Sequence, residues 1–279
     1  MSPLRRALAG LLLLGAPLAA QEKPAEPAER PALGFLGQLL LRSRDAGSLD
    51  RLEGERWFRL QSKQGGDAVI MVRVQTTADP PRLVLETTLT TLAQPVRNEM
   101  HTQVLMGADG RIQAFRSALR TGGAAESRAQ GRVTGAALEL EVQEPGRPPR
   151  AEQKPWNPEA VPGLALMFVV PALWDALPGD ATEVVQFDES AARLAHRVVL
   201  RAHSDPGAQG PELVTVTLVD AADRRSVQLE ARVDPQGKIV ELKREGSVIR
   251  ALAAEEAQRL LAAERAREAQ GPQGQPGPR

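Results

Sequence analysis

The 279-residue chain contains no cysteine and no tyrosine, and aromatic residues make up only 3% of it. Without cysteine the chain can form no disulfide, thiolate metal site or cysteine nucleophile, and it cannot be an acylated lipoprotein of the usual kind. Sites for sugars and for single-stranded nucleic acids usually stack their ligands on aromatic rings. The scarcity of aromatic residues therefore disfavours both ligand classes.

An excess of charge of one sign is also missing, because 35 basic residues balance 35 acidic ones. No block of like charge is long enough to form a nucleic-acid surface, so we expect no nucleic-acid partner. Long apolar runs are missing as well. The apolar stretch at 7–18 is well short of the ~20 residues that span a bilayer, and we expect no transmembrane span in the mature chain.

The N-terminus has the pattern of a secretory signal peptide. Two adjacent arginines precede the apolar stretch 7–18, and the small residues Ala19 and Ala20 precede Gln21. A basic segment, a short apolar segment and small residues at the exit are what a signal peptidase recognises. We predict cleavage between Ala20 and Gln21, and hence a periplasmic or secreted protein; an uncleaved anchor is the alternative.

Composition divides the remaining chain into segments. Residues 21–33 form a Pro/Ala/Glu linker with too little apolar surface to fold, and 271–279 hold three collagen-like triplets, too few for a triple helix, so we expect a disordered tail. The predicted layout is a signal peptide at 1–20, the linker at 21–33, an antiparallel β-domain at 34–252, a C-terminal helix at 253–270 and the tail at 271–279. The β-domain divides into halves at 34–143 and 176–252, joined by a Pro-rich loop and an apolar helix at 144–175.

The dominant period between the linker and the C-terminal helix is two. Residues 69–76 and 82–92 are rich in β-branched residues, and apolar and polar residues alternate from Met100 to Met106. Such alternation is typical of antiparallel strands with one buried face and one solvated face. We therefore predict a mainly β (α+β) fold, a curved antiparallel sheet or half-barrel with one apolar helix and a C-terminal helix.

Two segments of the chain resemble each other without a gap. Residues 105–115 (LMGADGRIQAF) and 232–242 (RVDPQGKIVEL) align at an offset of 127 positions, each with a four-residue turn that ends in glycine. The alignment predicts two three-strand meanders, at 83–92, 96–106 and 111–119 and at 212–220, 225–234 and 238–246. Either the chain holds an internal duplication, or two hairpins with glycine turns look alike by chance.

An apolar segment, 164–174, separates the halves and is too short to span a membrane. We predict a buried or interfacial helix that Pro171 kinks or ends. Trp156 and Trp174 flank it, and with Phe168 they are the candidates to line a ligand cavity. The plainer alternative is that these aromatic side chains belong to the core.

No catalytic or metal-binding pattern is present. His196 and His203 lie seven residues apart in a predicted strand, so they point to opposite faces. Glu99 and His101 share a face, but two ligands do not make a metal site. Ser190 lacks the flanking glycines of a nucleophile elbow. We therefore predict no catalytic residues, no metal and no cofactor.

Short motifs resemble two kinds of exported bacterial β-domain. Asp109-Gly110-Arg111-Ile112, Gly122-Gly123, Gly135-Ala136-Ala137-Leu138 and Pro155-Trp156-Asn157 are similar to a run in the β-region that precedes the transglutaminase-like core of some secreted proteins. The overall layout resembles the lipoprotein carriers of the LolA/LolB type. The resemblance implies a curved sheet that holds long apolar molecules, while the absence of cysteine excludes transglutaminase chemistry.

Three functional hypotheses remain. The first is a non-catalytic structural or interaction module of the bacterial envelope, with an envelope protein as partner. The second is a periplasmic binder or carrier of a lipid or a lipoprotein acyl chain, held in the concave face of the sheet. The third is an enzyme with a dispersed site, which would require Glu99, His101 and Asp188 to converge in space.

Overall fold

The computed structural model describes residues 33–45, 52–63, 66–78, 81–92, 97–122, 126–203 and 213–269. The predicted signal peptide, residues 21–32 of the linker and the tail at 271–279 lie outside these residues, and their predictions stay untested.

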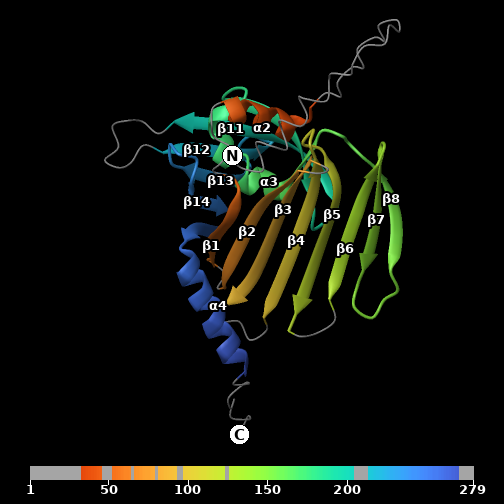
Figure 1. The fold of residues 1–279 in the computed structure, drawn as a ribbon, viewed down its shortest axis with the longest axis vertical. Helices are drawn as coiled ribbons and strands as arrows, with labels where there is room; N and C mark the ends of the chain where they lie inside the picture. The colour runs from red at the N-terminus through yellow and green to blue at the C-terminus, as the bar shows by residue number, and fades with distance from the viewer. Residues whose placement is uncertain are drawn as a thin grey trace, which may run out of the picture.

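The described residues form one large sheet and a few helices (Figure 1). The strands are β1 (Gly54–Ser62), β2 (Asp67–Ala78), β3 (Pro81–Leu92), β4 (Asn98–Gly107), β5 (Ile112–Thr121), β6 (Ser127–Thr134), β7 (Ala137–Gln143), β8 (Arg150–Pro155), β9 (Ala160–Pro162), β10 (Ala181–Asp188), β11 (Arg193–His203), β12 (Val214–Asp220), β13 (Val227–Val233), β14 (Ile239–Arg244) and β15 (Ser247–Leu252). The helices are α2 (Phe35–Asp45), α3 (Gly163–Phe168), the 3-10 helix η2 (Pro171–Ala176) and α4 (Ala254–Ala269).

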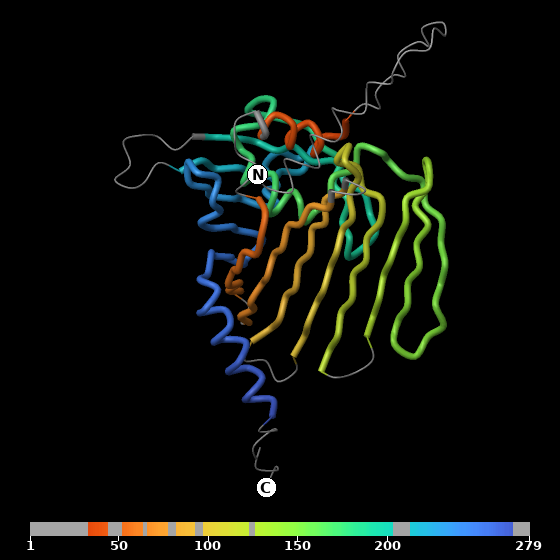
Figure 2. The backbone as a smooth tube through the Cα atoms, viewed as in Figure 1, coloured from red at the N-terminus to blue at the C-terminus, as the bar shows by residue number. Residues whose placement is uncertain are grey.

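The sheet is two meanders joined through the first and last strands. Its order is β8-β7-β6-β5-β4-β3-β2-β1-β15-β14-β13-β12-β11-β10-β9, and the neighbours are antiparallel except β9 and β10. Strands β8 and β9 follow each other in the chain but form the two ends of the sheet, which stays open. Figures 1 and 2 show β2–β8 fanned across the front, with strands of the second meander crossing behind them at a steep angle. This confirms a mainly β chain with one curved sheet.

Alternation along the strands gives the sheet an inner face that is buried and an outer face that is largely polar. On β2, for example, Ile70, Val72 and Val74 are buried on the inner face, while Arg73 between them points outward. The buried inner side chains of both meanders belong to one apolar core. The predicted period of two is therefore the pattern that assigns each residue to a face.

The predicted apolar helix lies inside this core. It is broken into α3 and η2, and the backbone N–H groups of both Val169 and Val170 donate to the carbonyl oxygen of Ala165. Pro171 begins η2, as its fixed φ and missing N–H favour at the start of a helix. Phe168 is 2% exposed, and its ring centroid lies 5.2 Å from that of Phe58 on β1. The chain thus fills the centre of its own concave face with residues 163–177, which we call the plug.

The two similar segments form equivalent hairpins, β4–β5 and β13–β14. Each has a bulge at the same place, where Met106 pairs with Ile112 and Val233 pairs with Ile239, at the predicted offset. The turn glycines Gly110 and Gly237 have φ values of 76° and 79°. The strands that precede the hairpins, β3 and β12, do not keep the offset of 127. Met106 pairs with Leu83, but Val233 pairs with Val214, four residues beyond the position that the offset predicts. The similarity is therefore local to the hairpins.

Helix α4 lies on the outer face, as its narrow apolar stripe favours. Ala257 is fully buried against Val69 and Leu92, and Leu260 and Leu261 pack beside it. Figure 1 shows the helix running along the β1 side of the fan. It covers only the lower part of β1–β3, so the outer face of β4–β8 stays uncovered by α4.

The prediction of a loop and a helix at 144–175 was wrong in part, because this segment also contains the strands β8 and β9. The sequence pattern does not predict β8, because its inner face carries Arg150, Glu152 and Lys154 in place of apolar residues. These charges remove the two-residue hydrophobic period. Strand β9 has three residues, too few to show a period.

The sequence interpretation also missed α2. Leu36, Leu39 and Leu40 are buried at helical spacing, but Gly37 lies among them and weakens the helical pattern. The structure explains this glycine: a Cβ there would lie 2.2 Å from the carbonyl oxygen of Asp109 in the β4–β5 turn. Helix α2 is thus positioned by the hairpin tip on which it packs.

Candidate functional site

Strand register brings one residue from each of eight strands into one line on the outer face, and seven of the eight are polar. The line consists of Glu55, Arg73, Glu86, Gln103, Arg116, Gln130, Glu141 and Ala151, each paired with the next across neighbouring strands. We call it the outer row. A second line lies one step along β4–β8 and consists of Leu105, Ala114, Arg132, Glu139 and Gln153. No single segment of the sequence reveals either line, because each strand contributes one residue.

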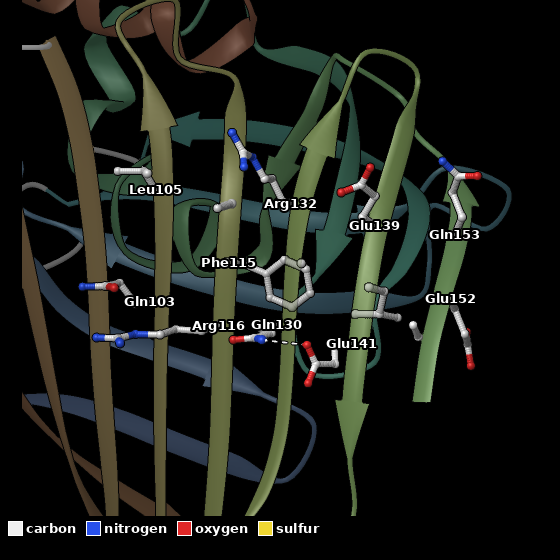
Figure 3. Close-up of a pocket in the computed structure, with 14 residues that line it drawn as sticks. Gln103, Leu105, Phe115, Arg116, Gln130, Arg132, Glu139, Glu141, Glu152 and Gln153 are labelled. Atoms are coloured by element: carbon white, nitrogen blue, oxygen red, sulfur yellow. Dashed lines mark hydrogen bonds between the residues drawn. The ribbon is translucent and has the colours of Figure 1, made fainter. Parts of the chain in front are cut away.

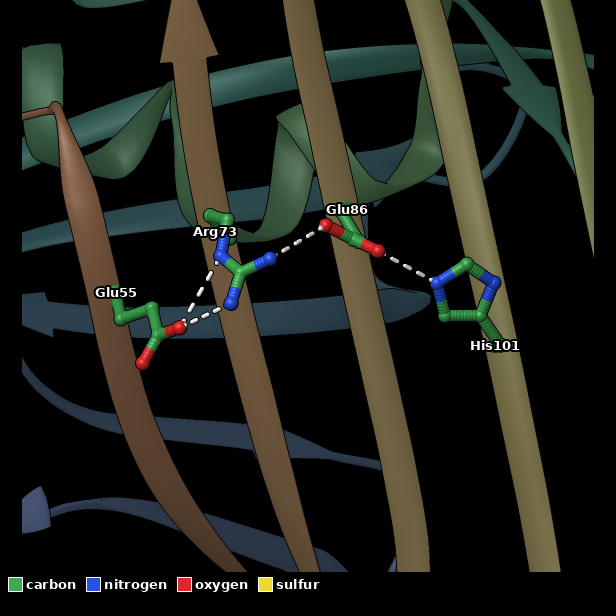
Figure 4. A network of polar contacts seen from close by, with 4 residues as sticks. All are labelled: Glu55, Arg73, Glu86 and His101. Atoms are coloured by element: carbon green, nitrogen blue, oxygen red, sulfur yellow. Dashed lines mark hydrogen bonds and ion pairs between the residues drawn. The ribbon is translucent and has the colours of Figure 1, made fainter.

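Over β1–β4 the charged side chains of the outer row contact one another and His101 (Figure 4). Arg73 forms an ion pair with Glu55, and its Nη1 lies 3.3 Å from Glu86 Oε2. The hydrogen bond to Glu55, with further help from Glu86, raises the pKa of Arg73. The other oxygen of Glu86 lies 2.7 Å from His101 Nε2. These four residues thus form a continuous network of contacts within the fold.

Over β4–β8 the outer face is hollowed into a groove of about 810 Å³ (Figure 3). Its lining is Gln103, Leu105, Ala114, Phe115, Arg116, Gln130, Gly131, Arg132, Glu139, Leu140, Glu141, Ala151, Glu152 and Gln153. Gln130 Nε2 donates to Glu141 Oε2 at 3.0 Å. Arg116, Arg132 and Glu139 are exposed, and none of the three has an ion-pair partner among the described residues. The groove therefore offers unpaired charges of both signs beside amide groups.

The three predicted cavity residues pack in the apolar core. Trp156 is 8% exposed and meets Phe187 edge to face, with 5.1 Å between ring centroids. Phe168 is buried in the core, and Trp174 in η2 is half-buried. The three side chains thus share one core, and a role in lining a ligand cavity stays a prediction.

The histidine and carboxylate candidates contact other residues of the fold and do not come together in one site. His101 contacts Glu86 and not Glu99, whose Oε1 lies 3.7 Å from Arg97 Nη2. His196 pairs with Val185 in the β10–β11 hairpin. Within the described part of the chain, His, Asp and Glu side chains nowhere gather in a group of three that could hold a metal.

Ser190 and Asp188 belong to the β10–β11 turn. Ser190 Oγ donates to Asp188 Oδ1 at 2.6 Å, and the backbone N–H groups of Ser190 and Ala191 donate to the same oxygen. Burial opposes ionisation of Asp188, but these hydrogen bonds outweigh it and lower the pKa of the carboxyl group. The serine hydroxyl is therefore a turn-stabilising donor.

Glu189, next in the chain, is the residue that sequence reasoning missed. It is 5% exposed, and its Oε1 accepts the backbone N–H of Leu164 at 3.2 Å. Its Oε2 lies 3.0 Å from the place where a Cβ on Gly163 would be. Burial raises the pKa of Glu189 to about 7, against the opposing effect of backbone hydrogen bonds. A carboxyl group thus holds the start of the plug, where the sequence shows only an ordinary acidic pair.

These observations define a mainly β protein with an open curved sheet, a self-filled concave face and a grooved polar outer face. No helix in the described ranges has the length and hydropathy that crossing a membrane requires.

No protein-family profile matches the chain, so the resemblance to LolA/LolB carriers and to transglutaminase-associated regions gains no support from a family match. No curated protein sequence matches either. Among solved structures, the chain is similar to a beta-barrel-like protein of the domain of unknown function DUF1849 from Brucella abortus. The two are 12% identical with a TM-score of 0.49, over 72% of this chain and 95% of that one.

Proposed function

We propose that this chain is an exported, non-catalytic interaction module of the bacterial envelope, and that it contacts its partner through the groove over β4–β8. The observation that carries the proposal is the contrast between the two faces. The concave face is filled at its centre by the plug, whereas the outer face keeps an open groove with unpaired charges.

The balance of charge within each region supports this assignment. Exposed ion pairs contribute little to stability, so a protein loses little by leaving such charges unpaired where a partner pairs them. In the outer row Arg73 forms ion pairs within the fold, while Arg116 has no ion-pair partner in the part of the chain that the structure describes. Unpaired surface charges that are complementary to those of a partner raise the specificity and the rate of association.

Site-specific photocrosslinking in cells tests the proposal. A benzophenone amino acid replaces Gln130 or Gln153 in the groove, and, as the matched control, the exposed Gln236 at the β13–β14 turn. We expect the two groove positions to crosslink one envelope protein and the control position to give no such product. Crosslinks of equal yield at all three positions, or none at the groove, would contradict the proposal.

One observation favours the second function, binding of an acyl chain. On the inner face, Phe58, Ile70, Leu89, Met100 and Leu119 form a line across β1–β5. Exposure rises along this line from 2% at Phe58 to 42% at Leu119. The end of the line is therefore an open apolar shelf beside the plug.

Titration with a dansylated undecanoic acid tests the shelf. If it binds acyl chains, the probe's fluorescence rises on addition of the protein, and Leu119→Glu abolishes the rise because a carboxylate then lies on the shelf. The control, Val240→Glu, changes an equally exposed apolar residue on β14. An absent signal, or one that both variants leave intact, removes this function.

A further inference from the structure

The groove over β4–β8 also carries information about the chemistry of its partner. The inference rests on the proposed function, since it describes what the same surface recognises. Its starting point is the position of the charges: Arg116 lies on β5, Arg132 on β6, and Glu139 and Glu141 lie side by side on β7. The positive and negative charges thus occupy neighbouring strips of the groove (Figure 3).

The spacing of these strips is set by the sheet. Neighbouring strands lie about 4.8 Å apart, so the arginines lie about 5 to 10 Å from the glutamates across the groove. An extended peptide rises about 3.3 Å per residue, and side chains on one of its faces are about 6.6 Å apart. A peptide laid across the strands would therefore place two same-face side chains, one over each strip.

The lining disfavours other ligand classes. Glu139 and Glu141 would repel a polyanion as it followed the arginines. A lipid surface would find only Leu105 and alanines on the floor. A sugar would find no exposed ring to stack on, because Phe115 is 4% exposed and belongs to the core. Amides at Gln103, Gln130 and Gln153 suit the N–H and C=O groups of a peptide backbone.

The free edge of the sheet favours binding on the face over the addition of a strand at β8. Arg150, Glu152 and Lys154 point to the inner face of this edge strand, and Glu152 contacts both basic side chains, at 2.8 and 3.5 Å. Inward-pointing charges on an edge strand discourage pairing with another chain.

We propose that the groove over β4–β8 binds an extended peptide segment of a partner protein, in which an acidic and a basic side chain lie two residues apart and point the same way. The acidic side chain meets Arg116 and Arg132, and the basic side chain meets Glu139 and Glu141.

Selection of random heptapeptides displayed on phage tests the proposal on the full purified chain. We expect the wild-type protein to enrich peptides with one acidic and one basic residue separated by a single residue. The double variant Arg116→Glu/Arg132→Glu makes the strips uniformly acidic and should enrich basic peptides. The variant Glu139→Lys/Glu141→Lys should enrich acidic ones. Synthetic peptides with the sequences that the wild-type protein selects should bind each groove variant at least about tenfold more weakly than they bind the wild type.

The control is Arg224→Glu/Arg225→Glu, which makes the same charge change at exposed positions between β12 and β13 and should keep wild-type binding. The proposal is overturned if no peptide is enriched, if the peptides are apolar or of one sign, or if the groove variants bind them as the wild type does. It is equally overturned if the protein binds dextran sulfate through Arg116 and Arg132 and selects no peptide. Groove crosslinks in cells without a selected peptide would leave the proposed function standing and remove this inference alone.

Discussion

Replacing Glu189 with glutamine should remove a large part of the pH dependence of stability. The carboxyl group is buried at the start of the plug, and burial raises its pKa from 4.5 to about 7. Because the folded-state pKa lies above the unfolded one, the group's contribution to stability is fully present below pH 4.5. That contribution is lost as the pH rises through 7.

The magnitude follows from the change in pKa. A rise of about 2.5 corresponds to about 3.4 kcal/mol, of which about 2.5 kcal/mol falls between pH 5 and pH 8. Glutamine keeps an oxygen that accepts the N–H of Leu164 and carries no charge to desolvate. The Glu189→Gln variant should therefore gain about 2.5 kcal/mol on the wild type between pH 5 and pH 8.

Urea unfolding followed by tryptophan fluorescence measures the free energy of unfolding at each pH. Glu183→Gln is the matched control, because it removes a carboxylate from an exposed position on β10, the strand that leads into the turn with Glu189. A difference in free energy between Glu189→Gln and the wild type that stays constant from pH 5 to pH 8 would contradict the prediction, because the ionisation of Glu189 would then not change the stability of the fold.

Three further outcomes are expected. Gly37→Ala should lower the free energy of unfolding, measured by urea titration, by more than about 1 kcal/mol, although the same change in an exposed helix raises it by about that amount. The reason is that the new Cβ would meet the carbonyl oxygen of Asp109. A stabilised variant would contradict that contact. Ala257→Arg should detach α4, so that hydrogen exchange over 254–269 becomes fast while β1–β7 stay protected; unchanged protection of α4 would refute its docking on the sheet. Mass spectrometry of the protein from an envelope fraction should find an N-terminus at Gln21, and an intact Met1 would contradict the predicted cleavage.

The sequence predicted those features of the fold that local pattern controls. The period of two identified strands such as β2–β4, and the turn glycines located the β4–β5 and β13–β14 hairpins to within two residues. Pro171 marked the break in the apolar segment. In each case the physical cause lies within a few neighbouring residues.

What the sequence could not predict depends on partners far away in the chain. The outer row takes one residue from each of eight strands, so it exists only once the register is known. Glu189 reads as half of an exposed acidic pair until the plug is packed against it. Strand β8 has charges where a core strand would have apolar residues, because the core ends before it reaches that edge.

Native mass spectrometry tests whether the chain itself fills the concave face and whether the outer groove contacts a partner. The protein is purified without detergent from the envelope fraction, where we propose that it acts, and is measured intact. We expect either the calculated mass of the chain alone or that mass plus a protein partner, which Arg116→Glu/Arg132→Glu releases. A reproducible added mass that organic extraction removes, identified as a lipid, would contradict this expectation and establish the acyl-chain carrier in its place.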